Sequence, residues 1–430
     1  GGSGQWNIFF GIPATTLVKM PPYAQVEPDT YVQVDKESFN LTQDGEGYYL
    51  INNLADWEKF AVYSRLRPTL NARLTADISL TAGNARLGIG NFDNTTQNLA
   101  YQGAFDGQRH TITVDFNFPN RAECLFMWVN NASIYRLKVA GTIRTQAVHT
   151  GGIIRSALGS ITIEDCESAV NIIGTPTTVT NLYMGGFIGH GHNAQIYMTD
   201  CLFTGSITGI AKHRYASAFL GWMESAGRIT YNYCLNNGTF TNLEVSNTYA
   251  LGITQSNGQS TAVNCYYRSN NVTNNESLAQ SVSDAQLESG YVTFRLQGTR
   301  PEQHWGQLLG TDLFPRLTDE EGTRVYRGQT YTNEPTAYTG LLQDEDGYYL
   351  IGGTADWEEF CIVVEELPLS NARMIADVEV IGNSMVGNST SPYAGIFDGQ
   401  GHTLTINYDR TGLAYSQSMD YGAAPFLFIQ

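Results

Sequence analysis

The chain is poor in charge, and poorest in positive charge. Charged residues make up 15% of its 430 residues, and 24 basic against 41 acidic side chains leave a formal net charge of −17. Nucleic acids and other anionic polymers are recognised through basic surfaces, so this balance disfavours them as partners. We therefore predict no nucleic-acid partner.

Long apolar runs are also missing. No stretch approaches the roughly 18 apolar residues of a membrane-spanning helix, so we predict no membrane span in this chain. Disorder is disfavoured as well, because hydrophobic residues reach 42% and aromatics 12%. The 44 glycines and 25 tyrosines instead indicate a β-rich protein with many turns. The opening Gly1-Gly2-Ser3-Gly4 is typical of a cloning remnant or a processed start.

Cysteine is scarce, but four of the six cysteines occupy one repeated position. They follow one another at intervals of 35, 33 and 31 residues, at Cys166, Cys201, Cys234 and Cys265. Small-residue segments alternate with them, as in Gly185-Gly186-Phe187-Ile188-Gly189. A near-constant period with short β-type runs indicates stacked repeats.

The expected architecture follows from how the repeats would stack on one another. One unit of this length cannot bury its apolar face alone, whereas parallel pairing of successive units buries it continuously. We predict an all-β right-handed parallel β-helix with short capping helices, followed by the start of a second similar unit. The cysteines would form a ladder about 4.8 Å apart with parallel side chains. Disulfide geometry disfavours that arrangement, so we expect buried free thiols.

The opening part of the chain occurs twice. Ala355-Asp356-Trp357 matches Ala55-Asp56-Trp57, and Phe397-Asp398-Gly399-Gln400 matches Phe105-Asp106-Gly107-Gln108. The second copy stops at Phe426–Gln430, which we align with Leu125–Val129. The expected organisation is an N-terminal β segment (1–40), a β-helix with its preface and closing cap (41–317), a linker (318–338) and an incomplete second preface (339–430).

Local patterns predict the capping elements. Ala55–Val62 is typical of a short amphipathic helix with Trp57 and Phe60 on one face. Ser283 is a candidate N-cap of a helix that Val292–Leu296 could extend. Trp305–Pro315 is typical of an apolar turn covering the end of the stack.

These repeats resemble a known family. The Gly-Gly-Phe-Ile-Gly segment followed by Met198-Thr199-Asp200-Cys201 resembles the GLUG-motif β-helix repeats of bacterial surface proteins. Asn71–Ile78 and Tyr101–Ile112 resemble the segment that precedes such repeats in secreted or surface-anchored proteins of gut Gram-negative bacteria. The resemblance implies a secreted or cell-surface location, on the outer face of a Gram-negative bacterium. It also implies an adhesive or carbohydrate-contacting role, and it supplies no catalytic set.

Aromatic side chains at matching positions of successive coils would form a stripe. Flat aromatic rows bind sugar faces, and neighbouring Asn and Asp would supply hydrogen bonds. The alternative is that some of these rings point inward, as strand alternation predicts for about half of them. The predicted glycan-binding residues are Tyr197, Trp222, Tyr231, Tyr233, Tyr266 and Tyr267.

Carboxylates near the repeat strands give an enzyme alternative. Glu164, Asp165, Asp200 and Glu224 would suit glycoside hydrolysis if two of them lay at the required separation. Asp165 and Asp200 each precede a ladder cysteine, so we expect them side by side on a solvated acidic edge, where Ca²⁺ between them is conceivable. A lyase would need basic residues, and Lys212-His213-Arg214 is the one such cluster in the repeats.

Two histidines in Gly189-His190-Gly191-His192-Asn193 can begin a metal site. A third ligand from Asp200, His213 or Glu224 would require the corners to fold together. We expect instead a glycine-rich turn with two exposed histidines, and we predict no metal site and no cofactor. The tight Asp106-Gly107 turn has a structural explanation, because both residue types suit turn backbones.

The sequence thus favours an extracellular, adhesin-like or glycan-contacting stalk without catalytic residues. Its partners would be host or microbial glycans or surface proteins, with end-to-end self-association at the unfinished second unit. A polysaccharide-degrading β-helix enzyme, hydrolase or lyase, is the alternative. A structural spacer is the third possibility.

Overall fold

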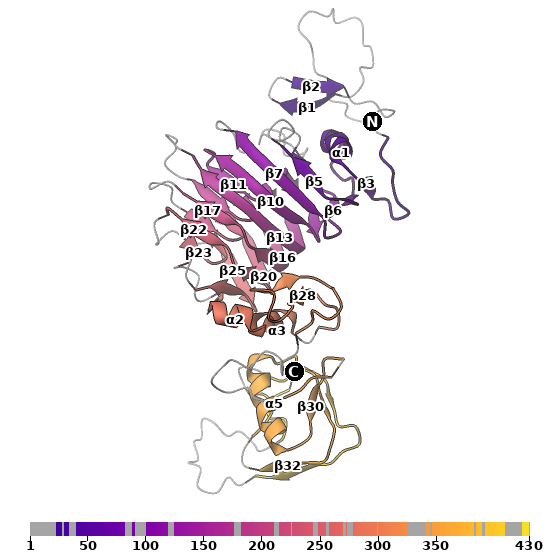
Figure 1. The fold of residues 1–430 in the computed structure, drawn as a ribbon, viewed down its shortest axis with the longest axis vertical. Helices are drawn as coiled ribbons and strands as arrows, with labels where there is room; N and C mark the ends of the chain where they lie inside the picture. The colour runs from indigo at the N-terminus through magenta and orange to yellow at the C-terminus, as the bar shows by residue number, and fades with distance from the viewer. Residues whose placement is uncertain are drawn as a thin grey trace, which may run out of the picture.

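The structure is a computed structural model of the chain. It describes residues 23–27, 30–33, 40–81, 88–90, 100–118, 124–175, 182–209, 215–224, 226–243, 248–254, 258–269, 272, 278–298, 300–325, 341–344, 346–381, 384–388, 392–408 and 424–429. Parallel strands stack coil upon coil into a β-solenoid of about 5 turns, which confirms the predicted parallel β-helix (Figure 1).

The largest sheet carries the cysteine repeat and has 16 strands. Its early members are β3 (Tyr49–Ile51), β4 (Ala72–Leu74), β5 (Ile78–Leu80), β6 (Ala104–Asp106), β7 (Thr111–Phe118), β9 (Ser133–Tyr135) and β10 (Lys138–Thr145). Its later members are β13 (Ser160–Gly174), β16 (Gln195–Phe203), β17 (Ser206–Thr208), β20 (Arg228–Asn232), β21 (Leu235–Asn236), β22 (Thr239–Thr241), β25 (Gln259–Val263), β26 (Tyr266–Arg268) and β27 (Gln280–Val282).

Two smaller parallel sheets complete the coils. One contains β8 (Phe126–Asn130), β12 (Ile154–Leu158), β15 (Ile188–Gly191), β19 (Leu220–Met223) and β24 (Gly252–Thr254). The other contains β11 (His149–Gly151), β14 (Tyr183–Gly185), β18 (Tyr215–Ser217) and β23 (Thr248–Tyr249). Outside the solenoid, β1 (Tyr23–Glu27) and β2 (Thr30–Gln33) form an antiparallel pair.

Inward side chains stack in register along the solenoid. Ile134, Ile163, Met198 and Tyr231 occupy one row, each fully buried. Cys166 pairs in register with Cys201, and the flanking pairs put Cys234 and Cys265 in the same row. All six cysteines are buried free thiols, which confirms the expected ladder. Each ladder thiol donates to the carbonyl two residues earlier, as Cys201 Sγ does to Thr199 O at 3.4 Å.

A sharp corner precedes each ladder cysteine. The residue before the cysteine has a positive φ in every coil: 53° at Asp165, 50° at Asp200, 53° at Tyr233 and 48° at Asn264. This left-handed backbone is uncommon for residues other than glycine, and Asp and Asn tolerate it best. The corner turns the chain so that the cysteine points inward and the preceding side chain points outward.

Helix α1 (Leu54–Leu66) lies at the start of the solenoid and connects β3 to β4, which pair with each other (Figure 1). It contains the predicted 55–62 segment, and its N-cap is Asn53, whose side chain accepts from Asp56 N at 3.0 Å. Trp57 and Phe60 are fully buried, and the Trp57 ring meets Phe105 edge-on at 5.9 Å. The helix therefore supplies apolar cover to the first coils.

The closing segment contains two helices rather than one. Ser283 caps α2 (Asp284–Glu288) through a capping box with Gln286, as its sequence predicts. Gly290 then adopts φ 84° and ends the first helix before α3 (Tyr291–Gln297) begins, so Val292–Leu296 does not extend α2. Strands β28 (Trp305–Gly306) and β29 (Arg316–Leu317) pair antiparallel after it.

This segment packs on the flank of the solenoid. Trp305, Leu287 and Leu296 bury against Leu202, Leu235 and Tyr266, which stand in one outward row on β16, β21 and β26. The expectation that Trp305 covers only the end of the stack is therefore too narrow. Residues 318–325 follow on the same side, where Gln307 N donates to Thr323 O at 2.7 Å, and the rest of the 318–338 range lies outside the described residues.

The second copy repeats the geometry of the first. Its elements are β30 (Tyr349–Ile351), α5 (Thr354–Glu366), β31 (Ala372–Met374), β32 (Val378–Ile381), β33 (Phe397–Asp398) and β34 (Leu404–Asn407). Tyr349 pairs with Ala372 as Tyr49 pairs with Ala72. Val386 bridges Phe426 as Ile89 bridges Phe126, which shifts the predicted alignment of the last residues by one position.

Candidate functional site

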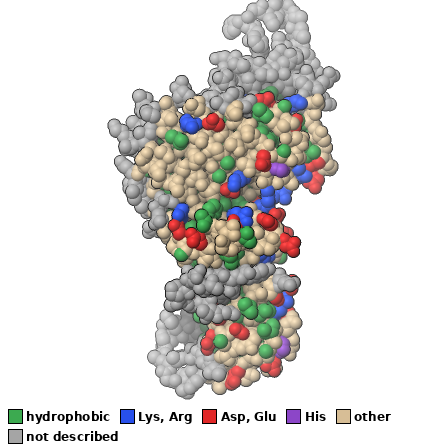
Figure 2. All heavy atoms as spheres, viewed as in Figure 1, with side chains coloured by type: hydrophobic (Ala, Val, Ile, Leu, Met, Phe, Trp, Pro, Cys, Tyr) green, Lys and Arg blue, Asp and Glu red, His purple; other side chains and the backbone are tan. Residues whose placement is uncertain are grey.

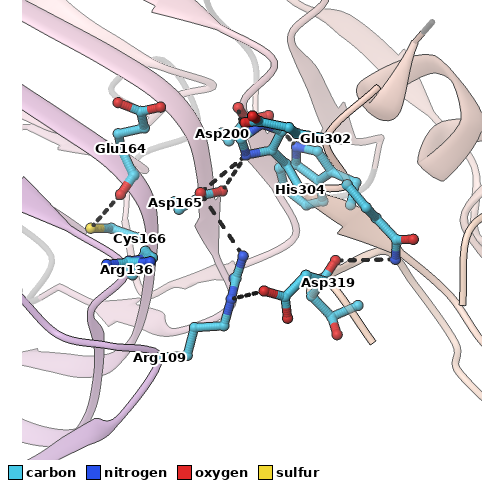
Figure 3. Close-up of polar contacts among 12 residues, drawn as sticks. Arg109, Arg136, Glu164, Asp165, Cys166, Asp200, Glu302, His304 and Asp319 are labelled. Carbon is cyan, nitrogen blue, oxygen red and sulfur yellow. Dashed lines mark hydrogen bonds and ion pairs between the residues drawn. The ribbon is translucent and has the colours of Figure 1, made fainter. Parts of the chain in front are cut away.

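Charged side chains gather at the corner before the cysteine ladder. Asp165 and Asp200 stand there in adjacent coils, as their spacing predicts, and His304 from the closing segment reaches both (Figure 3). One ligand-type atom from each of the three residues lies within 4.8 Å of the others. The question is whether this corner is open to a substrate.

Asp200 is fully buried and saturated with donors. Arg300 donates to both of its carboxylate oxygens at 2.6 and 2.9 Å, and Trp305 Nε1 donates to Oδ1 at 2.6 Å. The Arg300 guanidinium also lies over the Tyr233 ring, 4.0 Å from its centroid. Charge-assisted, bidentate contacts of this kind fix geometry strongly. Asp200 therefore anchors the closing segment to the solenoid.

Asp165 is held by two basic side chains. His304 Nδ1 lies 3.0 Å from both of its oxygens, and Arg109 Nη2 lies 3.9 Å away. Arg109 also approaches Asp319 at 3.5 Å, so it links the first coils to the closing segment (Figure 3). The bond to Asp165 raises the pKa of His304, and burial raises the pKa of nearby Glu164 with help from the Asp165 and Asp200 charges.

These contacts correct the predicted solvated acidic edge. A fully buried carboxylate with three donors cannot meet a polysaccharide or a bridging Ca²⁺, so the Asp165–Asp200 pair belongs to an internal lock. Glu224 lies on a different sheet, after β19, and does not join this group. The basic Lys212-His213-Arg214 cluster lies outside the described residues.

The Asp106-Gly107 turn is likewise internal. Asp106 accepts from Gln108 N at 3.0 Å and from the Arg136 guanidinium, and it is buried. These bonds hold the pKa of Asp106 below its ordinary value against the opposing effect of burial. The turn thus has the structural role that its sequence predicts.

The six predicted aromatic residues do not form one exposed stripe. Tyr231 is fully buried in the inward row, and Tyr266 and Tyr267 are 2% and 4% exposed. Tyr233 is covered by Arg300, as described above. Tyr197 is 44% exposed, and Trp222 is partly exposed on the β19 strand.

The physical reason is strand parity. Tyr197 pairs in register with Thr230, and Tyr231 is therefore one position further along the strand, on the opposite face. A shift of one residue exchanges the two faces of a strand. Tyr266 points outward in register with Leu235, but the closing segment covers that row.

A different aromatic group lies on the two smaller sheets. His149, Tyr183 and Tyr215 are register partners in three successive coils and are partly exposed. The Tyr183 and Tyr215 rings stack at 5.2 Å with an interplanar angle of 5°, and His149 stacks on Tyr183 at 5.3 Å. Trp222 leans on Tyr183 with ring centroids 4.6 Å apart. We call these four residues the aromatic ladder.

The predicted histidine pair lies beside the aromatic ladder and is not an exposed turn. His190 is 7% exposed and stacks on His149 at 3.9 Å. His192 stacks on the buried Trp128 at 4.8 Å. Glu224, one of the three proposed third ligands, approaches His190 Nε2 at 3.4 Å and His192 Nδ1 at 3.2 Å. The coils therefore do bring this group together.

Figure 2 shows one face of the molecule, on which the β-helix carries few charged side chains and charged groups are more frequent around the closing segment. Among the described residues, the helices are all too short or too polar to span a bilayer.

Comparison with known proteins adds little to this description. No family model matches the chain, and no curated protein matches it. One solved structure that the chain partly resembles is described as a "putative immunoglobulin A1 protease" from Bacteroides ovatus. It is 14% identical, with a TM-score of 0.43 over 65% of this chain and 94% of that one. A likeness of this size says nothing about activity.

Proposed function

We propose that this chain is part of an extracellular, adhesin-like β-helix stalk of a Gram-negative bacterium, and that it contacts glycans without cleaving them. The observation that carries the proposal is the aromatic ladder of His149, Tyr183, Tyr215 and Trp222, whose side chains are partly exposed. The GLUG-like repeats support the location, and the parallel β-solenoid supports the stalk.

The chemistry of the ladder suits carbohydrate. Tyr and Trp offer a rigid apolar body together with a polar edge, and ordering them costs little conformational entropy. Tyr183 and Tyr215 stack face to face, so their edges rather than their faces line the surface. Trp222 is tilted by 42° to Tyr183 and offers a differently oriented ring. A glycan would gain C–H contacts on Trp222 and hydrogen bonds at the tyrosine edges.

A glycan-array screen of the purified chain, with product analysis of every bound polysaccharide, tests this function. Binding without cleavage is the expected result, with a roughly tenfold loss of affinity in Tyr183→Ala and Trp222→Ala. Tyr197→Ala removes an exposed tyrosine outside the aromatic ladder and should bind like the wild type. Cleavage of a bound polysaccharide, or equal losses in all three variants, would defeat the proposal.

A spacer role is the second candidate, favoured by apolar side chains at the end of the second copy. Ile406 is 44% exposed and Ile429 is 72% exposed, whereas their counterparts Val114 and Val129 are buried under a following coil. Exposed apolar surface of this kind marks association sites. We propose that the occupant in solution is a second copy of this chain.

A further inference from the structure

The group around His190 lies where two adjacent coils meet. Strands β15 and β19 run parallel, and Gly191 pairs in register with Met223. The next residues along each strand, His192 and Glu224, are therefore neighbours, and Glu224 N donates to Gly191 O at 3.0 Å. Asn193, at the corner after β15, accepts from Ala226 N at 3.1 Å. This bond fixes the segments that follow β15 and β19 relative to each other.

The two distances to Glu224 match those between ligands of one ion. Two ligand atoms that each lie about 2.1 Å from a tetrahedral zinc ion are about 3.4 Å apart. Glu224 Oε1 lies 3.4 Å from His190 Nε2 and 3.2 Å from His192 Nδ1. The three ligand atoms all lie within 4.8 Å of one another, and the set would close once the two imidazole rings, whose centroids are 3.7 Å apart, rotate away from each other.

The His190 Nε2 atom is buried without a hydrogen bond among the described residues, and a metal ion would explain its position. The side chain is 9% exposed, and Glu224 Oε1 lies 3.4 Å from this nitrogen, but the nitrogen makes no hydrogen bond to any residue that the structure describes. A buried polar nitrogen left without a partner is costly, because it has lost its contact with water. A metal ion between His190 and Glu224 would satisfy it.

The charges around this group are mixed. Glu224 brings a negative charge that favours a cation here, whereas the nearby Arg155 charge opposes one. Imidazole nitrogens and carboxylate oxygens are both ligands that zinc takes in proteins.

We propose that His190, His192 and Glu224 bind one divalent transition-metal ion, with Zn²⁺ the best fit to two imidazoles and one carboxylate. Three protein ligands leave a fourth position for water or an external ligand. Glu224 and His192 are 36% and 23% exposed in their side chains, so that position faces solvent. The ion would join two coils directly beside the aromatic ladder.

Metal binding alone tests this site in the intact 430-residue chain. After dialysis against EDTA, calorimetry should detect one Zn²⁺ per chain, and the visible absorption of added Co²⁺ should report a tetrahedral environment. Zn²⁺ should also raise the melting temperature, because an ion that binds the folded state stabilises it. His192→Ala and Glu224→Gln should each weaken binding by more than the roughly tenfold cost of losing an outer-shell partner.

Matched variants keep the result specific. His402 lies 3.4 Å from Asp377 without a second histidine, so His402→Gln should leave Zn²⁺ binding unchanged. Arg155→Met should strengthen binding, because it removes the opposing charge. Absence of Zn²⁺ binding to folded wild-type chain would overturn the site, and so would loss of binding in His304→Gln but not in His192→Ala. Glycan binding is measured separately, so failure of one proposal does not decide the other.

Discussion

Arg300 and Asp200 form a bidentate ion pair across one hundred residues of sequence, with N–O distances of 2.6 and 2.9 Å. Asp200 is fully buried, whereas the Arg300 side chain is 23% exposed. The pair joins the closing segment to the middle of the solenoid, and Trp305 shares the same carboxylate.

Asp200→Ala should therefore destabilise the chain strongly. Removing one partner of a buried ion pair leaves Arg300 and Trp305 Nε1 without their acceptor, and such losses cost about 3 kcal/mol. The measurement is the thermal or urea unfolding transition, together with proteolysis of residues 283–317. Asp115→Ala is the control, because Asp115 pairs with Arg144 at the surface, where a bridge contributes roughly 0 to 1 kcal/mol. Equal effects of the two variants would contradict the lock.

Stability should also depend on His304. Its pKa is raised by Asp165, so the protonated form stabilises the folded state. This contribution is complete below the ordinary imidazole pKa of about 6.5 and is lost as the pH rises through the higher folded-state value. Melting temperatures across that range should fall more in the wild type than in His304→Asn. Parallel curves for the two proteins would show that the His304–Asp165 bond contributes nothing.

The two Phe-Asp-Gly-Gln turns should respond differently to the same substitution. A Cβ at Gly107 would lie 2.5 Å from Arg136 O and 2.5 Å from Leu137 Cα, because the next coil covers the turn. At Gly399 a Cβ would meet nothing within 4 Å. Gly107→Ala should therefore cost about 1 to 3 kcal/mol by overpacking, and Gly399→Ala should stay within about 0.5 kcal/mol. If Gly399→Ala lowered the free energy of unfolding more than Gly107→Ala, the described stacking of a coil over the Gly107 turn would be contradicted.

The ladder thiols should be inert in the folded chain. Burial raises the pKa of Cys201 to about 11 and raises that of Cys166, Cys234 and Cys265 further above the ordinary range. Only thiolates react, so alkylation at neutral pH should leave these four unmodified until the chain unfolds. Mass spectrometry counts the added groups: six in denaturant are expected, and a disulfide-linked peptide would refute the ladder.

Self-association should depend on the end of the second copy. Light scattering at increasing concentration should show dimers or longer species, and Ile406→Asp should reduce them because it places a charge in the contact. Thr405→Asp, one residue away on the opposite face of β34, is the control. A strict monomer at high concentration would remove this contact.

The sequence predicted the architecture because repetition is a one-dimensional signal. The cysteine spacing gives the coil length, and an offset of 300 residues gives the second copy. The prediction was wrong at Tyr231, which lies 34 residues after Tyr197, whereas the local coil is 33 residues long. This difference of one residue puts the Tyr231 ring on the inward face of its strand. The aromatic ladder did leave a signal, since His149, Tyr183 and Tyr215 each stand two residues before a small-residue segment.

The Arg300–Asp200 and His304–Asp165 contacts had no such signal. They join residues 100 and 139 positions apart, and no period in the sequence connects them. The sequence predicted only part of the His192–Glu224 contact. Glu224 follows the strand that is one coil on, but only the Gly191–Met223 register shows that it faces His192.

The most direct measurement of the proposed function is the affinity of the wild-type chain and of Trp222→Ala for the glycan that the array retains best, by calorimetry. The glycan-contacting account predicts a roughly tenfold weaker Kd for Trp222→Ala with an unchanged melting temperature, and wild-type affinity for Tyr197→Ala. Equal affinity of wild type and Trp222→Ala, or no retained glycan at all, would contradict it and leave the spacer role.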